Sequence, residues 1–178
     1  SPYSELFFDK KNISISSKIP KNSFHLGSFS KTLVPSLRIG WIRADEQLLK
    51  TLMIIKEGID VHSCGISQYI LNEYLEDEEK YEKHLQKIRD DYAKKANFFC
   101  EQLDKYLPEF KYEKPKGGMF LYGSFEGIDS FALVQKCIEQ KVVYVPGNQF
   151  YIDKIPNGEI RFNYTHSSFE QIEKGIKL

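Results

Sequence analysis

The pattern from Glu78 to Leu107 most constrains how this chain can fold. Apolar side chains recur through it at the three- and four-residue spacing of a single helix face, with charged residues between them. The pattern ends just before Pro108, where a helix is expected to end. A helix of this length often connects two domains. We therefore predict three parts: residues 1–77, a bridging helix at 78–107, and a smaller domain at 108–178. The expected core positions of the helix are Tyr81, Leu85, Ile88, Tyr92, Ala96, Phe99, Leu103 and Tyr106.

The composition is that of a folded domain and argues against two classes of partner. Hydrophobic residues make up 41% of the chain and aromatic residues 14%, which is enough for a packed core. The 25 basic and 25 acidic side chains are interspersed, without the basic stripe that is typical of a nucleic-acid-binding face. No apolar run approaches the roughly 20 residues that span a bilayer, and no signal-peptide pattern is present. We expect no nucleic acid and no membrane as partners of this segment.

The cysteines and histidines do not form a recognisable metal or disulfide motif. Cys64, Cys100 and Cys137 lie far apart, and the four histidines lack metal-ligand spacing. We therefore expect no metal site and a reducing, cytoplasmic setting.

Shorter elements are expected on both sides of the long helix. Before it, residues 23–29 and 37–44 read as strands, the second apolar enough to be buried on both faces. A helix should follow Asp45, and another should start near Ser63. After Pro108, strands are expected within 110–115, 117–125 and 159–166, and a turn is expected at Pro146 and Gly147 within the segment 142–150. Helices should follow Asp129 and begin at Ser167 or Ser168. This alternation predicts a compact α/β or α+β layer.

The segment GSFSKTLVPSLRIGWI (residues 27–42) carries the strongest chemical signal. Ser28, Ser30 and Arg38 supply hydroxyl and guanidinium groups, which together with loop amides are natural ligands of a phosphate. Near an Arg, Lys31 would give up its proton more readily and could attack an aldehyde. An aldehyde that bears a phosphate and forms Schiff bases with lysine describes pyridoxal phosphate. Spacing alone also allows a turn whose serines cap backbone groups and whose lysine is exposed.

A resemblance to a known family extends this interpretation over nearly the whole chain. The segment above resembles the lysine segment of class I/II aminotransferases, the fold-type I pyridoxal-phosphate enzymes. The closest subgroup contains the 2-aminoadipate and kynurenine aminotransferases and the aminotransferase-like half of MocR-type regulators. Four further segments match in the right order: SPYSEL at 1–6, KPKGGMFLY at 114–122, VVYVPGNQF at 142–150 and EIRFNYTHSSFEQIEKGIKL at 159–178. Five ordered matches are a specific signal.

The resemblance assigns roles to individual residues. It implies that Lys31 forms the Schiff base with the cofactor and carries the substrate's proton, while Ser28, Ser30 and Arg38 bind the cofactor phosphate. Tyr3 would direct its hydroxyl toward the cofactor's phenolic oxygen.

Arg161 would pair with the substrate carboxylate through its planar fork. Arg is scarce in this chain, since only four of the 25 basic residues are arginines. Arg43 and Arg89 lie outside the matched positions and receive no role.

The resemblance also implies how much of an enzyme is present. Residues 1–77 would be the C-terminal portion of the large cofactor-binding domain, joined by the bridging helix to the small C-terminal domain at 108–178. The family's aspartate that pairs with the pyridine nitrogen would fall one residue before Ser1. An aromatic that stacks on the ring, an asparagine and an N-terminal arm would also lie upstream. We expect the C-terminal half of a fold-type I enzyme that is inactive alone.

The parent function implied is transfer of an amino group between an amino acid and a 2-oxo acid by a homodimer. Two alternatives stay open. One is a cofactor-binding sensor domain of a MocR-type transcriptional regulator. The other is a different fold-type I activity, such as a β-lyase or a decarboxylase.

Overall fold

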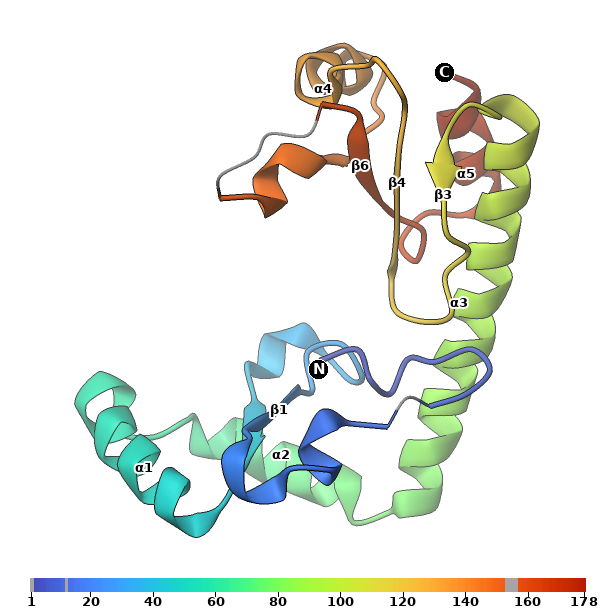
Figure 1. The fold of residues 1–178 in the computed structure, drawn as a ribbon. Coiled ribbons are helices and arrows are strands. Elements are labelled where there is room, and N and C mark those ends of the chain that lie inside the picture. Colours follow the sequence, from blue (N-terminus) through green and yellow to red (C-terminus); the bar gives the residue numbers. More distant parts are fainter. Residues whose placement is uncertain (1, 12, 153–156) are drawn as a thin grey trace. The chain divides into compact units, whose positions relative to one another are not determined.

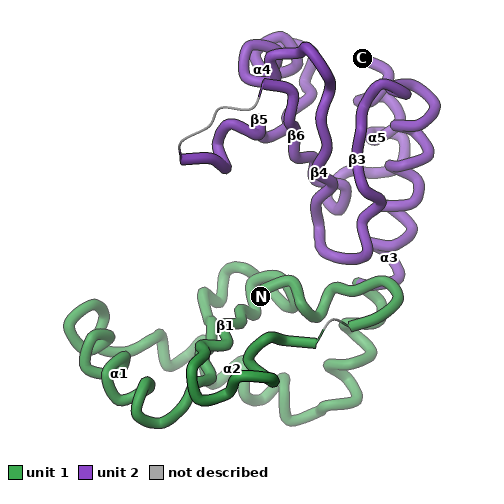
Figure 2. The backbone as a smooth tube through the Cα atoms, in the orientation of Figure 1, with its two compact units in different colours: residues 1–88 green, residues 89–178 purple. Residues whose placement is uncertain are grey.

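Two compact units make up the chain in the computed structural model, which describes residues 2–11, 13–152 and 157–178 (Figure 1). The units comprise residues 1–88 and 89–178 (Figure 2). Helix α3 (Glu78–Tyr106) contributes to both and matches the expected long helix. The three-part domain division itself stays a prediction. Within the described residues, no helix combines the length and the apolar character needed to cross a membrane.

The first unit contains a two-stranded antiparallel hairpin. Strand β1 (His25–Ser28) pairs with β2 (Gly40–Arg43), so that Ser28 lies opposite Gly40. Both strands were expected, but the prediction that the second is buried on both faces is wrong. All four residues of β2 are exposed, and burial is limited to Ile39 just before it. The apolar run in this strand marks a surface that the described residues leave uncovered.

Two helices follow the hairpin. Helix α1 (Glu46–Asp60) begins after Asp45, whose carboxylate accepts a hydrogen bond from the Gln47 N–H, as expected for a helix cap. Helix α2 (Gly65–Leu75) begins two positions after the predicted start near Ser63. No side chain of α1 is fully buried, and three of its apolar residues are more than 60% exposed. These three are Met53, Ile54 and Ile59.

The second unit is built on a four-stranded antiparallel sheet with the order β3-β4-β6-β5. The central strands are β4 (Phe120–Ser124) and β6 (Glu159–Asn163), in a register that places Tyr122 opposite Arg161. Strands β3 (Lys111–Tyr112) and β5 (Val145–Pro146) form the edges. Because successive side chains alternate between the two faces of a sheet, Arg161 and Ile160 face opposite sides.

One face of this sheet forms the core of the second unit. Leu121 and Ile160 are almost completely buried there, and the Phe162 ring packs 5.4 Å from that of Phe99 on α3. Helix α5 (Phe169–Lys177) lies beside α3 in Figure 1 and contributes two buried isoleucines. The other face carries the polar residues of β4 and β6, which leaves it available for a site.

Local signals set the remaining boundaries as expected. Helix α4 (Ser130–Glu139) follows Asp129, whose carboxylate accepts two backbone N–H bonds, and Ser168 opens α5 with a capping box. Gly118 has a φ of +82°, a conformation that residues with a Cβ rarely adopt. A turn therefore needs glycine at this position before β4.

Candidate functional site

The loop that joins β1 to β2 holds most of the expected site. It opens where the hairpin pairing ends, and the Phe29 N–H donates to Ile39 O at 3.1 Å across its base. Just before it, Gly27 lies against the Trp41 ring, where a Cβ would come within 2.2 Å of a ring carbon. The close approach of this ring to the backbone therefore requires glycine at position 27.

Ser28, Ser30 and Arg38 are brought together in this loop. The Ser30 N–H donates to Ser28 Oγ at 3.2 Å, and Arg38 Nη1 donates to Ser30 Oγ at 3.4 Å and to Pro35 O at 3.3 Å. Arg38 reaches this position from a left-handed backbone conformation, with φ 55° and ψ 33°, at the end of the short 3-10 helix η3 (Pro35–Leu37). Residues eight positions apart thus form one cluster of hydrogen-bond donors.

Lys31 comes directly after Ser30 in the same loop and is half-buried. The next residue, Thr32, is buried, and its carbonyl oxygen lies 3.0 Å from Nε2 of His84 on α3. Since a carbonyl oxygen only accepts, His84 donates this bond. Thr32 and His84 therefore fix the backbone beside the lysine. Sequence reasoning missed both, because a pair 52 positions apart leaves no local pattern.

Tyr3 lies in a turn near the N-terminal end of the described chain. The Leu6 N–H donates to Tyr3 O at 3.0 Å, and the Leu6 side chain is completely buried. The Tyr3 side chain is half-buried. Its expected role toward a cofactor stays a prediction.

Arg161 belongs to the second unit and projects from the polar face of β6. Its guanidinium carbon lies 4.3 Å from the ring centre of Phe120 and 4.8 Å from that of Phe150, a favourable cation–π arrangement. Its Nε atom is buried and finds no hydrogen-bond partner among the described residues. A buried N–H without a partner is costly, so this geometry fits a ligand that supplies the acceptor.

The model of the family "aminotransferase class I and II" matches residues 3–177, almost the whole chain. The chain belongs to this family. Membership confirms the resemblance and the α/β, fold-type I class expected from the sequence. The cofactor that it indicates is pyridoxal phosphate.

Proteins of similar sequence include both enzymes and transcriptional regulators. The chain is 36% identical over 155 residues to aromatic-amino-acid aminotransferase 1 of Thermococcus litoralis, covering 86% of this chain and 37% of that one. It is 31% identical to the HTH-type transcriptional regulator NorG of Staphylococcus aureus, covering 98% of this chain and 39% of NorG.

Solved structures of aminotransferases share the fold. The Pyrococcus horikoshii kynurenine aminotransferase, solved in complex with PMP, superposes with a TM-score of 0.92 at 33% identity. The match covers 99% of this chain and 44% of that enzyme. The chain thus spans less than half the length of the relatives it matches.

The hydrogen-bond donors of the 28–38 loop suit the phosphate group of the aminotransferase cofactor. Two hydroxyls and a guanidinium converge there, and the loop sequence contains no acidic residue. Such a set suits the oxygen atoms of a phosphate, because each group donates hydrogen bonds and the only charged partner is positive. The residues present therefore fit the phosphate end of the cofactor.

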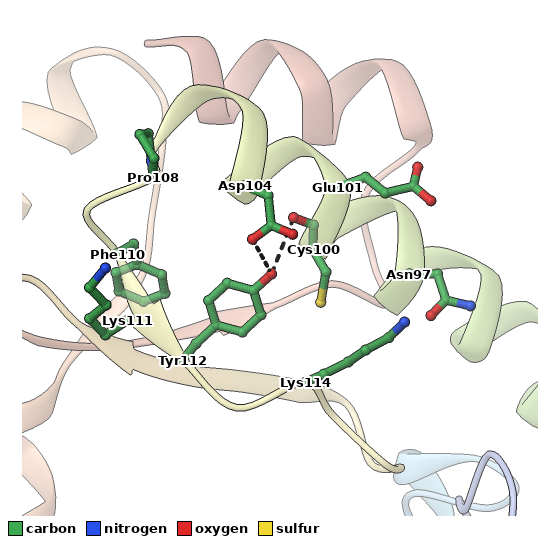
Figure 3. A pocket seen from close by; sticks show the side chains of 9 residues that line it. All are labelled: Asn97, Cys100, Glu101, Asp104, Pro108, Phe110, Lys111, Tyr112 and Lys114. Carbon is green, nitrogen blue, oxygen red and sulfur yellow. Dashed lines mark hydrogen bonds between the residues drawn. The ribbon is translucent and has the colours of Figure 1, made fainter.

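A separate groove lies in the second unit (Figure 3). Its volume is about 720 Å³, and none of the predicted site residues lines it. The Tyr112 side chain reaches from β3 toward α3, where its hydroxyl donates to Asp104 Oδ1 at 2.7 Å and to Cys100 O at 3.3 Å. This tyrosine fastens edge strand β3 to α3, which is a structural role in this aminotransferase domain.

Four tyrosines give the second unit a predictable response to alkali. Burial is the main cause that raises the pKa of Tyr112, Tyr122, Tyr144 and Tyr164. A raised pKa means that the fold favours the neutral phenol, so the stabilisation is complete below the unfolded pKa of about 10 and is lost above it. We expect the free energy of unfolding, measured with urea and circular dichroism, to fall as the pH rises past about 10. The Tyr164→Phe variant should fall less steeply; an identical slope would contradict this explanation.

Proposed function

We propose that the full-length protein is a pyridoxal-phosphate-dependent aminotransferase that moves an amino group between an amino acid and a 2-oxo acid. The observation that carries the proposal is the cluster of Ser28, Ser30 and Arg38 directly beside Lys31. Because the chain belongs to the aminotransferase family, we interpret this cluster as a cofactor site; without that membership, the same groups would also fit an ordinary turn.

The 28–38 loop binds and orients the cofactor. Ser28, Ser30 and Arg38 hold its phosphate, and the hydrogen bonds already formed between them reduce the reorganisation needed on binding. When bound, the cofactor supplies an aldehyde that condenses with amines and a ring that withdraws electrons. Lys31 would bind the cofactor through its amine and would move a proton to and from the substrate Cα. Tyr3 donates its hydroxyl toward the phenolic oxygen.

Arg161 recognises what donors and acceptors have in common. Both the amino acid and the 2-oxo acid carry a carboxylate next to the reacting carbon, and a guanidinium fork binds a carboxylate through two parallel hydrogen bonds. The buried Nε has no acceptor among the described residues, which supports this role because a carboxylate oxygen would satisfy it. The identity of the substrate side chain is left to other parts of the site.

The setting of this activity is also part of the proposal. We expect a homodimer, as the family resemblance implies, and a cytoplasmic location. The three cysteines are free of disulfides, which is in keeping with a reducing compartment. We expect no nucleic acid to bind this segment.

One observation favours a second function. NorG, an HTH-type transcriptional regulator, matches 98% of this chain at 31% identity. The same fold could therefore serve as a sensor that binds the cofactor and its amine adducts without sustained turnover. Other fold-type I activities, such as a β-lyase, use the same lysine and would release different products.

Product formation separates these functions. The full-length protein is mixed with pyridoxal phosphate, a panel of amino acids and a 2-oxo acid, and both new products are measured by chromatography. We expect an amino acid and a 2-oxo acid in equal amounts. Cofactor binding without products would favour the sensor, and ammonia with unequal products would favour a lyase.

A second prediction concerns the activity of the isolated 178-residue chain. Because they span less than half of the matched relatives, we expect no amino-donor turnover by this chain in the same assay. Stoichiometric visible absorbance together with turnover by the isolated chain would overturn this expectation.

A further inference from the structure

We propose that Tyr122 and Tyr151 are positioning residues that occupy Glu159 and thereby keep Arg161 unpaired for a carboxylate ligand. This inference rests on the proposed role of Arg161. It concerns three side chains to which neither the sequence motifs nor the comparisons assign any role.

The argument starts from the spacing on β6. Glu159 and Arg161 are two residues apart on one strand, so their side chains project from the same face of the sheet. Both are long enough to meet there, and a carboxylate beside a guanidinium normally forms an ion pair. Among the described residues no such pair is formed, because no acidic group lies within salt-bridge distance of Arg161.

Both oxygens of Glu159 are instead occupied by phenols. The Tyr122 hydroxyl donates to Oε2 at 2.7 Å, and the Tyr151 hydroxyl donates to Oε1 at 3.1 Å. Tyr122 is the direct cross-strand partner of Arg161, and Tyr151 comes from the segment after β5. Burial and the bond to Glu159 raise the pKa of Tyr122, so its hydroxyl keeps the proton it donates at neutral pH.

Arg161 is held separately, by rings rather than by an acid. Phe120 and Phe150 lie against its guanidinium, and the Tyr122 ring meets that of Phe150 edge-on with centres 6.0 Å apart. This contact joins the residues around the cation to those around the anion. The two charged side chains on this face therefore have separate partners. Phenol hydroxyls donate to Glu159, whereas the buried Nε of Arg161 has no acceptor among the described residues.

This division has a consequence for binding. A free Glu159 could pair with Arg161 and would compete with any incoming carboxylate for the same guanidinium. Removing the two phenol hydroxyls should therefore weaken the binding of donors and acceptors alike, since both present a carboxylate to Arg161. Removing the charge of Glu159 as well should abolish the competition.

The test compares the Tyr122→Phe/Tyr151→Phe double variant with a triple variant that adds Glu159→Gln, both in the full-length protein. The double variant should raise the KM for the amino acid and for the 2-oxo acid by a similar factor, on the order of threefold to tenfold, with a smaller effect on kcat. The triple variant should restore both KM values. Tyr144→Phe is the matched control, because its hydroxyl bonds Ser130 O instead of Glu159.

A binding measurement makes the inference independent of turnover. Propionate, a carboxylate that cannot be transaminated, is titrated by NMR into the same proteins and into Arg161→Gln. The wild type should bind it through Arg161, the double variant more weakly, and the triple variant as the wild type does. A double variant that binds normally, a triple variant that is not restored, or binding that does not need Arg161 would overturn the inference. Absence of turnover with the expected propionate pattern would reject only the proposed enzymatic function.

Discussion

A full-length protein in which Lys31 is replaced by Ala is expected to lose at least about four orders of magnitude of its amino-transfer rate. The substitution removes the amine that we propose binds the cofactor and moves the substrate's Cα proton. The Ser28, Ser30 and Arg38 cluster remains, so the variant should still bind the cofactor phosphate noncovalently. Borohydride treatment followed by peptide mass mapping should place the pyridoxyl mass on Lys31 in the wild type and nowhere in the variant.

Lys10→Ala provides the control for this experiment. Lys10 is an exposed lysine of the same unit and lies outside the 28–38 loop, so its removal should leave rate and labelling unchanged. If Lys31→Ala kept its activity, or if the label appeared on another lysine, the assignment of the catalytic amine would be wrong.

Replacing Arg161 by Lys should lower kcat/KM on the order of a hundredfold for amino acids and 2-oxo acids together. Lysine keeps the positive charge but cannot form the bidentate pair with a carboxylate, and it makes a poorer contact with the Phe120 and Phe150 rings. Steady-state kinetics with one amino acid and one 2-oxo acid measure kcat/KM for the donor and for the acceptor.

The matched control is Arg43→Lys, an arginine exposed on β2 with no assigned role. Its kinetics should match the wild type. A loss confined to donors, with acceptors unaffected, would show that Arg161 does not read the shared carboxylate.

The sequence predicted those elements whose signals are local. Helix α3 follows from a continuous apolar stripe that stops before Pro108, and the starts of α1, α4 and α5 follow from Asp45, Asp129 and Ser168. The Ser28, Ser30 and Arg38 cluster was also predictable, because one short loop carries all three groups.

The remaining features depend on contacts between distant residues. The bond from His84 to Thr32 and the phenol bonds from Tyr122 and Tyr151 to Glu159 each require the folded chain. The burial of β2 was mispredicted for a related reason. An apolar strand indicates that something covers it, but the pattern cannot say whether the cover lies within the same residues.

The left-handed backbone at Arg38 carries a consequence for how this loop can change. A residue with a Cβ costs about 1–2 kcal/mol in that conformation, and glycine would relieve most of it. A laboratory selection for thermal stability alone should therefore replace Arg38 by Gly and yield a sturdier protein that holds phosphate poorly. A selection that also demands the cofactor should keep the arginine. Stability and phosphate binding thus favour different residues at position 38, and the arginine found there is the one that the proposed binding role requires.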